Sequence, residues 1–504
     1  MNTHADKTPQ SACWGMEALE ERARVQERFQ AANASRREEW ISANAYYYRQ
    51  VTNLLRFIIE PQTRVLVLRS ETGFLLDALS PERGVGTELS DEMVLLAKRR
   101  YPAYEFHKLQ SERFKLNEKF DYVVFNNISD TVDIAASLRQ IHAVSEPWTR
   151  LVIYTYNSWW EPIIRLAEKF GLKTPFHEPN WLSPVDIENL LTIGDFELLR
   201  VYRIILVPKY IPLLSEFLNR FIAPLPLINR LCMVSTFVAR PKMHRSESNK
   251  SRVSLIIPCK NEEGNIEPAV KRIPEMGSHV EIIFCDDHST DQTAAEVRRM
   301  QTTFPARDIK LVTGPGISKA RNVWTGFEQA TGDILMILDA DLAVMPEELP
   351  LFFDALVSGK GEFINGSRLV YPIPNAAMKY FNMLGNKVFS WIFSYLLFQP
   401  IGDTLCGTKV LFRRDWERMK HSLGRWGVED RWGDYELLFG AAKLHLKILD
   451  LPVHYQERIY GVTKMVRVFH NGLIMLRLCG GMLLKFRLRY YSSGEPPLSS
   501  VSRQ

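Results

Sequence analysis

Short β-branched runs alternate with helical patterns twice along this chain, and this double rhythm constrains the fold more than any other feature. In the first series we expect strands at residues 65–68, 122–125 and 151–154, with helices at 92–99 and 134–144. In the second series we expect strands at residues 253–258, 281–285, 309–312, 333–338 and 362–364. Alternating strands and helices are typical of parallel sheets covered by helices. The rhythm therefore predicts an α/β protein with two domains.

A polar stretch divides the two series. Residues 242–251 are rich in serine and lysine, which is typical of a linker. Before it we expect a helical segment at 1–45 and a first domain at 46–241, whose apolar, proline-broken end at 210–241 indicates a packed helical hairpin. After it we expect a second domain at 252–464, then a basic and apolar segment with a frayed tail at 465–504.

The composition excludes several classes of protein. Of the 504 residues, 46% are hydrophobic and 24% are charged, which is ordinary for globular domains and too apolar for a disordered chain. The formal net charge of +5 is too small to indicate a nucleic-acid partner. The six cysteines lie far apart without a Cys-x-x-Cys pair, so we expect neither a zinc knuckle nor a disulfide framework, and a reducing compartment.

The apolar stretches of the sequence are too short to cross a membrane. The N-terminal region carries acidic side chains and no apolar core, so we expect no secretory leader. The longest uncharged apolar run, residues 388–402, is interrupted by a proline and falls short of the roughly 18 to 20 residues that a spanning helix needs. We therefore expect a cytoplasmic protein, with peripheral contact to the cytoplasmic membrane face as an alternative.

Acidic and polar clusters follow three of the strands expected in the second domain. They occupy residues 257–263, 285–291 and 338–342. In an open parallel sheet, ligands bind beyond the carboxyl ends of the strands, so the three clusters converge on one crevice. Crowded carboxylates repel each other unless a cation compensates them, and Mg²⁺ prefers one or two carboxylates together with phosphate oxygens. The pattern predicts a site for a metal and a phosphorylated ligand.

Helix capping is the alternative interpretation of these acidic residues. Ser289 and Asp291 precede a helical pattern and are suited to cap it. Capping explains Asp339 and Asp341 less well, because an apolar strand runs directly into this Asp-x-Asp and two caps are not needed there.

Residues 253–464 resemble glycosyltransferase family 2, in particular the dolichyl- or polyprenyl-phosphate sugar transferases. The resemblance rests on ordered motifs rather than on the Asp-x-Asp alone. These motifs are Ile256-Ile257-Pro258-Cys259-Lys260-Asn261-Glu262, residues 286–291, 316–322, 332–333 and 339–341, Asn365-Gly366-Ser367-Arg368, and residues 403–409 and 455–464. The resemblance implies a GT-A fold, an inverting sugar transfer, and a nucleotide-sugar donor with a lipid-phosphate or glycan acceptor.

The resemblance also implies roles for individual residues. Asp339 and Asp341 would hold Mg²⁺ or Mn²⁺ on the donor diphosphate, and Arg368 would act in catalysis on a phosphate. The remaining residues that would contact the nucleotide sugar, besides Asp339, are Pro258, Glu262, Asp286, Asp287, Lys319, Arg458 and Lys464. Two departures, His288 for the usual glycine and Ala343 for a polar residue of some relatives, leave the nucleotide undetermined.

The nature of the acceptor decides whether a general base is needed. A lipid phosphate is already anionic, whereas a hydroxyl must lose its proton to a carboxylate. Asp434 is the candidate base, with Glu436 second, and capping of the following helix is the alternative for Asp434. Trp416, Trp426 and Trp432 would suit an acceptor platform, although packing in the core explains tryptophans more often.

Two segments of the sequence have the composition of a membrane-surface contact. The chain after Gly461 contains lysines and arginines and no acid before Tyr490, together with Leu473, Ile474, Leu476 and Leu483. Such a mixture suits an interfacial helix on anionic lipid. Residues 388–398 are a second candidate. Packing against the catalytic domain is the alternative for both.

Residues 46–203 resemble a class I S-adenosylmethionine (SAM)-dependent methyltransferase. The likeness rests on residues 65–73, 84–90 and 120–124, and it implies a cofactor site at Gly73 and Glu88. Arg69 and Glu71 stand where the family has glycines, and a side chain there fills the space of the cofactor and restricts positive φ. We therefore expect a retained fold that has lost SAM, so that methyltransferase activity is in doubt.

Together these features predict an α/β chain of two Rossmann-like domains, a methyltransferase-like fold followed by a GT-A glycosyltransferase fold. The leading hypothesis is a metal-dependent glycosyltransferase. The first alternative is a bifunctional enzyme that glycosylates and methylates a cell-envelope glycan, and the second is a non-catalytic scaffold.

Overall fold

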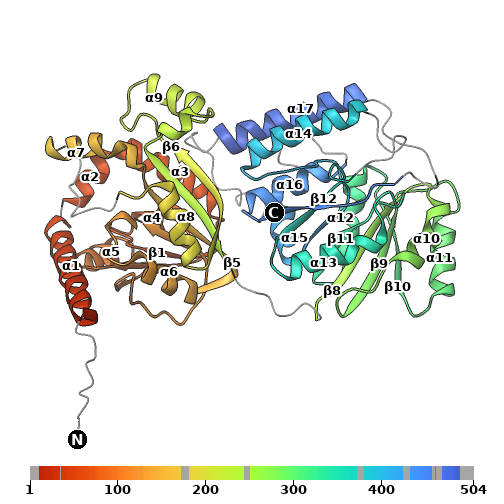
Figure 1. Ribbon diagram of the computed structural model, residues 1–504, viewed down its shortest axis with the longest axis horizontal. Helices are drawn as coiled ribbons and strands as arrows, with labels where there is room; N and C mark the ends of the chain where they lie inside the picture. The colour runs from red at the N-terminus through yellow and green to blue at the C-terminus, as the bar shows by residue number, and fades with distance from the viewer. Residues whose placement is uncertain are drawn as a thin grey trace, which may run out of the picture. The chain divides into compact units, whose positions relative to one another are not determined.

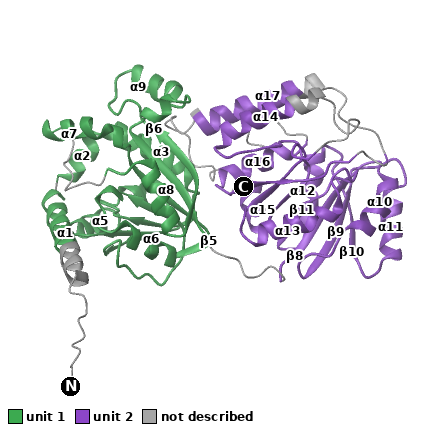
Figure 2. Cartoon of the chain, viewed as in Figure 1, with its two compact units in different colours: residues 1–242, 488–504 green, residues 243–487 purple. Residues whose placement is uncertain are grey.

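The computed structural model forms two compact units, which we describe one at a time. The first comprises residues 1–242 and 488–504, and the second comprises residues 243–487 (Figure 2). The structure describes residues 11–34, 36–126, 128–171, 181–242, 250–371, 380–423, 432–456, 460 and 468–488. Within these ranges no helix is both long and apolar enough to span a membrane. Most of the expected linker at 242–251 and the chain after 488 lie outside the described residues.

The first unit is built on a seven-stranded sheet with the order β3-β2-β1-β4-β5-β7-β6. Strands β1, β5 and β6 of this sheet are labelled in Figure 1. The first five strands in that order are parallel, and β7 runs antiparallel to both β5 and β6. The strand bounds are β1 Arg64–Leu68, β2 Arg83–Glu88, β3 Glu105–Lys108, β4 Phe120–Asn126, β5 Ser145–Tyr156, β6 Phe196–Ile204 and β7 Val234–Pro241.

Helices alternate with these strands, as the sequence rhythm predicts. Polar side chains set where two of them begin, since Ser90 accepts a hydrogen bond from the Met93 amide and Asp133 accepts one from the Ala136 amide. The bounds are α1 Ser11–Asn33, α2 Arg37–Ala43, α3 Ala45–Ile58, α4 Phe74–Leu79, α5 Asp91–Arg100, α6 Ile134–Ala143, α7 Glu161–Lys169, α8 Pro184–Ile193 and α9 Leu214–Phe217.

The packed helical hairpin expected at residues 210–241 is wrong. The segment contains only short turns, namely α9, a π-helical turn η3 (Leu218–Ile222) and a 3₁₀ turn η4 (Ile228–Leu231), and then the strand β7. All eight residues of β7 are buried between two neighbouring strands. An apolar segment without clear periodicity does not by itself distinguish a helix from a strand or from a series of turns.

The second unit contains another seven-stranded sheet, with the order β10-β9-β8-β11-β13-β12-β14. Strands β10, β9, β8 and β11 are parallel, whereas β13 is antiparallel to β11 and β12. The strand bounds are β8 Arg252–Cys259, β9 His279–Asp286, β10 Asp308–Thr313, β11 Ile334–Ile337, β12 Phe363–Ser367, β13 Lys409–Phe412 and β14 Ile448–Pro452. The helices are α10 Glu263–Arg272, α11 Thr293–Thr303, α12 Lys319–Gln329, α13 Leu349–Val357, α14 Tyr380–Leu397, α15 Arg413–Met419, α16 Asp434–Lys443 and α17 Val468–Leu483.

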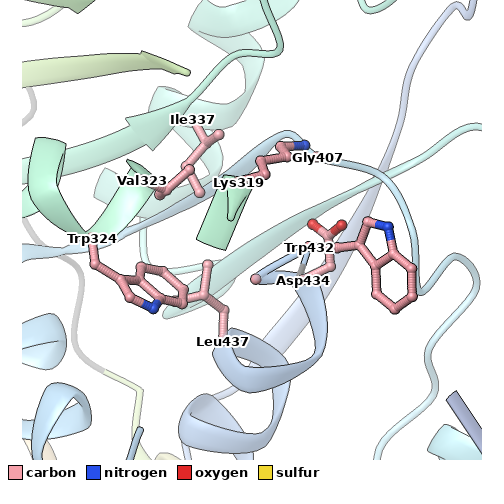
Figure 3. A pocket seen from close by; sticks show the side chains of 9 residues that line it. Lys319, Val323, Trp324, Ile337, Gly407, Trp432, Asp434 and Leu437 are labelled. Atoms are coloured by element: carbon pink, nitrogen blue, oxygen red, sulfur yellow. The ribbon is translucent and has the colours of Figure 1, made fainter. Parts of the chain in front are cut away.

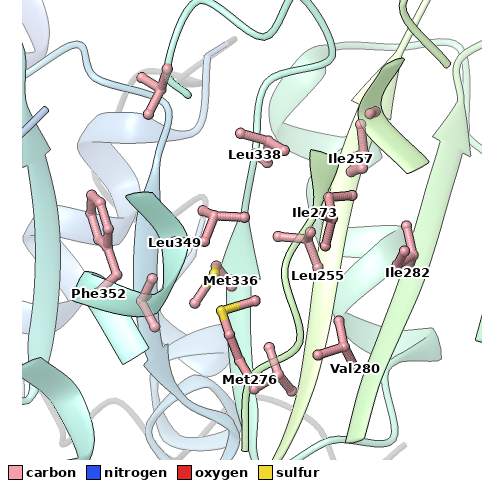
Figure 4. Close-up of a cluster of buried hydrophobic side chains, with 14 of the residues drawn as sticks. Leu255, Ile257, Ile273, Met276, Val280, Ile282, Met336, Leu338, Leu349 and Phe352 are labelled. Carbon is pink, nitrogen blue, oxygen red and sulfur yellow. The ribbon is translucent and has the colours of Figure 1, made fainter. Parts of the chain in front are cut away.

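One apolar core fixes the central strands of this unit against helices. Figure 4 shows Leu255 and Ile257 of β8, Ile282 of β9 and Met336 of β11 packed together, with Phe352 of α13 beside them. All five side chains are fully or almost fully buried. Burying a side chain of this size stabilises the fold by about 1.5–3 kcal/mol. The core therefore holds the carboxyl ends of β8, β9 and β11 in fixed positions.

The expected fold class, α/β with two Rossmann-like domains, is confirmed by the two sheets. The second candidate for lipid contact, residues 388–398, lies mostly in α14, and α17 packs beside it (Figure 1). On α17, Leu473, Leu476 and Arg477 share the exposed face, whereas Met475 and Leu478 are buried. The helix thus buries one face and presents a mostly apolar stripe to solvent.

Candidate active site and the corresponding site of the first unit

The three acidic clusters of the second unit meet at one edge of its sheet. Strands β9, β8 and β11 are neighbours and run parallel, so their carboxyl ends lie side by side. Asp287 follows β9, Glu262 follows β8 and Asp339 follows β11. This is the edge at which open α/β sheets bind ligands.

Asp339 forms an ion pair with Lys319, the first residue of α12. The Lys319 Nζ lies 2.6 Å from Asp339 Oδ1, and both side chains remain about one third exposed. Burial alone would lower the pKa of Lys319, but the carboxylates of Asp339 and Asp434 outweigh it and raise that pKa. Burial would likewise raise the pKa of Asp339, but the Lys319 ammonium outweighs it and lowers that pKa. Both groups are therefore charged at neutral pH.

Asp434 lies on the same pocket as Lys319. The pocket is lined by Lys319, Val323, Trp324, Ile337, Gly407, Trp432, Gly433, Asp434 and Leu437, and in Figure 3 the Asp434 carboxylate points towards the Lys319 side chain. Asp434 is the first residue of α16, while Gly433 with φ of 85° precedes the helix, so Asp434 is not its cap. Its Oδ1 accepts a hydrogen bond of 2.8 Å from Lys409 Nζ, whose side chain is fully buried.

Gly407 brings the chain backbone against the Asp-x-Asp. A Cβ atom at this position would lie 2.3 Å from Asp339 Oδ2, closer than real contacts allow. Only a glycine therefore lets the loop before β13 approach Asp339, and this approach puts Lys409 within electrostatic reach of the same carboxylate.

Arg368 is held by a buried aspartate rather than lying free. Its Nε and one terminal nitrogen donate to Asp403 at 2.7 and 2.9 Å, and its guanidinium lies 5.2 Å from the centre of the Tyr455 ring. Burial would raise the pKa of Asp403, but Arg368 outweighs burial and holds that pKa at about 2. This bidentate pair fixes the guanidinium plane, and Arg368 also acts electrostatically on Asp339.

The residues expected at the nucleotide lie in the loops after β8 and β9. Asp287 Oδ1 accepts a 2.8 Å hydrogen bond from the Gly316 amide, and Lys260 Nζ lies 3.6 Å from Asp287 Oδ2. The Asp286 carboxylate accepts from the Ser289 hydroxyl, and Glu262 Oε2 accepts from the Asn265 side chain at 2.8 Å. Pro258 is half-buried near the end of β8. These contacts order both loops around the crevice.

The N-cap position of α11 is Gln292, so neither Asp291 nor Ser289 is its cap, although Asp291 does accept from the first amide of the helix. Asp291 accepts from the Thr293 amide at 3.0 Å and from the Glu263 amide at 3.3 Å, so it ties the starts of α11 and α10 together. Ser289 instead donates to Asp286 and accepts from the Asn261 amide at 2.9 Å. It does not cap α11.

The Asp-x-Asp fits a divalent cation that is completed by a ligand. Among the described residues there is no group of three or more histidine, cysteine, aspartate or glutamate side chains that could hold a metal. Two carboxylates are what a Mg²⁺ site needs when substrate phosphates supply further oxygens. In this structure the cation beside Asp339 is the Lys319 ammonium. Asp341 Oδ1 accepts from the Ala343 amide at 3.1 Å.

Several expected residues are placed elsewhere or fall outside the description. Arg458, Lys464 and Trp426 lie outside the described residues. Trp416 is 1% exposed and its ring centre lies 5.1 Å from that of Trp324 in a tilted arrangement, so it belongs to the core rather than to an acceptor platform. Trp432 does line the pocket.

Lys409 and Asp403 are the site residues that the sequence reasoning did not assign. Both stand in the motif at 403–409, and each is the buried partner of an expected catalytic residue, Asp434 and Arg368 respectively. A lysine at the start of the apolar run Lys409–Phe412 was the available signal, because a buried lysine requires a carboxylate partner.

The corresponding strand end of the first unit is closed by its own side chains. Arg69 and Glu71 follow β1 with φ of 58° and 54°, so both adopt the left-handed backbone that glycine favours. Arg69 donates to Asp130 Oδ2 at 3.0 Å, and Glu71 accepts from Arg37 of α2 at 2.6 and 3.0 Å. The glycine-type backbone persists, and two ion pairs fill the space that glycines would leave.

Glu88, expected to bind the ribose of SAM, is engaged within this network. It is 2% exposed and accepts hydrogen bonds from the amides of Glu71 and Leu89, and burial raises its pKa to about 7. The Gln30 amide of α1, oriented to satisfy both partners, donates to Glu88 at 3.2 Å and accepts from Arg69 at 2.9 Å. Gly73 keeps φ of 83°, but a Cβ there would lie 2.7 Å from the Phe106 ring. The carboxylate of Glu88 is thus engaged by partners within the unit.

Comparison with known proteins decides the family of the second unit. Residues 254–418 match the sequence profile of glycosyl transferase family 2. The second unit carries a glycosyltransferase family 2 domain. The dolichol-phosphate mannosyltransferase of Pyrococcus furiosus is 36% identical over 121 residues, which are 24% of this chain and 34% of that protein. The chain thus spans about a third of the length of this relative.

Solved structures similar to this chain fall into two groups. Glucosyl-3-phosphoglycerate synthase from Mycobacterium tuberculosis, solved with Mn²⁺, UDP and glucosyl-3-phosphoglycerate, is 16% identical, with a TM-score of 0.34 over 48% of this chain and 82% of its own. A SAM-dependent methyltransferase from Thermotoga maritima is 16% identical, with a TM-score of 0.34 over 43% of this chain and 100% of its own.

Proposed function

We propose that the family 2 domain transfers a sugar, with inversion, from a nucleotide-diphosphate donor to an acceptor, using Mg²⁺ or Mn²⁺ held by Asp339 and Asp341. The observation that carries this proposal is the placement of Asp339 and Asp341 after β11, beside the cation Lys319 and at the carboxyl ends of parallel strands. The site collects cations around a carboxylate pair, which suits a ligand that brings both phosphate and metal.

Charge stabilisation is the chemistry such a site supplies. An acceptor oxygen forms a bond to the sugar C1 from the face opposite the leaving group, while the bond from C1 to the diphosphate oxygen breaks. The nucleoside diphosphate leaves with the electron pair, and a bound divalent cation would neutralise the charge that develops there. Lys319 would then exchange its contact with Asp339 for one with the diphosphate, since its side chain is about one third exposed and the stem of a lysine has many rotamers.

The surroundings of Asp434 favour an acceptor that needs no base. The candidate base already accepts a hydrogen bond from the buried Lys409 ammonium, so one carboxylate oxygen is occupied. A lipid phosphate such as polyprenyl phosphate arrives as an anion and needs no proton acceptor. The cation Arg368, oriented by Asp403, is suited to bind that phosphate. A glycan hydroxyl is the second candidate acceptor.

The methyltransferase-like fold of the first unit agrees with the bifunctional alternative in part, but the contacts of its strand-end loop do not. Its strand-end loop is filled by ion pairs of Arg69 and Glu71, and we propose that this unit is not a methyltransferase. We also propose that the exposed stripe of α17, with Leu473, Leu476 and Arg477, contacts the membrane surface where a lipid acceptor would reside.

A panel of sugar nucleotides tests the proposed function. Radiolabelled transfer is measured with Mg²⁺ or Mn²⁺, with and without polyprenyl phosphate, for the wild type and for Asp341→Ala. The exposed Asp354 of α13 offers a matched control as Asp354→Ala. We expect transfer that depends on the metal and is lost only in Asp341→Ala. Transfer that persists in Asp341→Ala would remove the metal assignment.

A further inference from the structure

In the chain between β6 and β7 of the first unit, polar side chains are buried and large apolar side chains are exposed. In this segment, residues 209–231, the fully buried side chains include the polar Ser215 and Asn219, whereas Leu213 is 88% exposed and Leu227 is 74% exposed. The other exposed large apolar side chains are Tyr210, Ile211, Leu214, Phe217, Phe221, Leu225 and Leu231. Isolated exposed leucines are ordinary, but a cluster of this size marks an interaction surface. We name this segment the apolar arm.

Buried polar groups help to attach the arm to the unit, together with the contact of the Tyr210 ring with the Tyr46 ring. Asn219 Oδ1 accepts from the amides of Leu206 and Val207 at 2.8 and 2.9 Å, and its amide donates to the Tyr46 hydroxyl at 3.0 Å. The Ser215 hydroxyl donates to the Lys209 carbonyl at 2.7 Å. Because these bonds fix the backbone, the leucines and phenylalanines are left to face solvent.

The two most exposed leucines adopt a sterically unfavourable backbone. Leu213 has φ of 64° and Leu227 has φ of 71°, each directly after a proline and directly before a helical turn. The Leu214 amide donates to the Pro212 carbonyl at 2.7 Å, which closes a γ-turn around Leu213. Strained residues of this kind persist only when the surrounding structure enforces them, and they cluster at functional sites. In this arm the two strained residues are also the two leucines most exposed to solvent.

The turn after β5 continues the same surface. Trp160 Nε1 donates to the Leu231 carbonyl at 2.7 Å, and the Asn157 side chain donates to the Arg230 carbonyl at 2.8 Å. Trp159, between these two anchors, is 78% exposed. Within the arm, the rings of Phe217 and Phe221 lie 5.7 Å apart. Figure 1 shows α9 and its neighbouring turns projecting from the first unit.

Positive charge accompanies these apolar side chains. The arm contains Lys209, Arg220 and Arg230, and its one acidic residue, Glu216, lies 3.1 Å from Arg49 in an ion pair. Exposed tryptophan, tyrosine and leucine mixed with lysine and arginine are suited to the boundary between lipid headgroups and acyl chains. Each cation near an anionic bilayer adds to the attraction.

We propose that the apolar arm inserts Leu213, Leu227 and Trp159 into the surface of a membrane that contains anionic lipid. The first unit is then a membrane-docking module, although it keeps the fold of an enzyme. This inference does not rest on sugar transfer, because neither the arm nor its anchors belong to the second unit. It also differs from the proposed contact of α17, which lies in the other unit.

Vesicle co-sedimentation tests the proposal with the full-length chain. The vesicles contain phosphatidylcholine with or without phosphatidylglycerol, and no polyprenyl phosphate. The test variant is Leu213→Gly/Leu227→Gly, in which glycine accepts the positive φ, so the fold is retained and thermal unfolding should not shift downward. The matched control is Leu95→Gly/Ile193→Gly, which removes two similarly exposed side chains from α5 and α8.

We expect the wild type and the control to bind phosphatidylglycerol vesicles alike, and the arm variant to bind at least tenfold more weakly. Raising the salt concentration should weaken wild-type binding. A third variant, Leu473→Ser/Leu476→Ser, removes the α17 stripe and should leave the dependence on Leu213 and Leu227 in place. Three outcomes would overturn the proposal: no binding by the wild type, full binding by the arm variant, or binding that ignores phosphatidylglycerol, as a surface for a protein partner would show.

Discussion

The two units place charged side chains at the same edge of similar sheets, yet with opposite consequences. In the second unit, Lys319 and Asp339 are 33% and 32% exposed, so the ion pair can open to a ligand. In the first unit, Arg69 and Asp130 are 5% and 13% exposed, and Glu71 is 10% exposed beneath Arg37. The first edge is sealed by ion pairs and the second is accessible. Exposure of the charged groups, not the fold, therefore separates a candidate site from a closed one.

The largest effect should come from the open edge. Replacing Asp339 by Asn removes one negative charge from the pair that would hold the cation, and we expect transfer to fall by about 10²–10³-fold, the scale seen when a charge-stabilising group is lost. The measurement is the initial rate with saturating metal. An Asp354→Asn variant should retain the wild-type rate, and an Asp339→Asn enzyme with unchanged activity would contradict the comparison.

The buried pair behind the open edge should matter for stability. Lys409→Met leaves Asp434 without its ammonium partner, and breaking a buried ion pair by removing one member costs about 3–5 kcal/mol. The free energy of unfolding of the second unit in urea measures this loss. Lys420→Met is the control, since Lys420 pairs with Glu417 at the surface and such pairs contribute about 0–1 kcal/mol. Equal losses in both variants would show that Lys409 does not anchor Asp434.

The closed edge of the first unit should make the stability of the protein depend on pH through Glu88. The pKa of Glu88 is raised to about 7 in the folded state, above the value of about 4.3 for a free glutamate, so its contribution to stability is full below pH 4 and is lost as the pH rises through 7. In Glu88→Gln this loss is absent. Between pH 5 and pH 8 the free energy of unfolding of the wild type should therefore fall by roughly 3 kcal/mol relative to that of the variant. Denaturant unfolding at both pH values checks it. If the difference in free energy of unfolding between the two proteins is the same at both pH values, the carboxyl of Glu88 is not buried as described.

The effect of Asp403 on stability should have the opposite dependence on pH. Its pKa is lowered to about 2 beside Arg368, so its stabilising contribution is present above the free value of about 3.9 and is lost as the pH falls through 2. As the pH falls from 4 to 2, we expect the free energy of unfolding of the wild type to decrease by about 2 kcal/mol because of this carboxyl. In Arg368→Gln this dependence should vanish. Acid titration of unfolding distinguishes the two proteins, and parallel curves would argue against the pair.

The smallest expected effect is the response to SAM. Since ion pairs of Arg69 and Glu71 fill the loop after β1, we expect calorimetry to detect no saturable binding and the melting temperature to stay unchanged. The control titration uses the nucleotide sugar that supports transfer, which should bind. Saturable SAM binding to the wild type would show that the first edge opens and would restore the bifunctional alternative.

The strand ends could be predicted from the sequence because each acidic cluster follows an apolar run. The Asp-x-Asp directly follows the apolar run that ends at Leu338, so it must lie at the carboxyl end of that strand, which is the end where such sheets bind ligands. The partners could not be predicted in the same way. Lys409 and Asp434 are 25 residues apart, and the ion pair depends on how β13 and α16 pack. Nothing in the local pattern of either segment identifies the other.

The first unit shows two further limits of sequence reasoning. The sequence identifies Arg69 and Glu71 as residues that stand in place of glycines, but their positive φ values and their partners Asp130 and Arg37 come from tertiary structure. The apolar character of residues 210–241 predicts a packed hairpin, and this prediction is wrong. Their true arrangement separates a buried strand, β7, from an arm whose apolar side chains face outward, and hydrophobicity alone gives the same signal for both.

Binding of Mn²⁺ is the most direct test of the claim that the open edge holds a metal–diphosphate complex. Electron paramagnetic resonance follows free Mn²⁺ while the wild type, Asp339→Asn and Asp354→Asn are titrated in the presence of the donor nucleotide sugar. We predict that the wild type and Asp354→Asn remove Mn²⁺ from solution only when donor is present, and that Asp339→Asn does so at least tenfold more weakly. Equal uptake of Mn²⁺ by all three proteins would contradict the account.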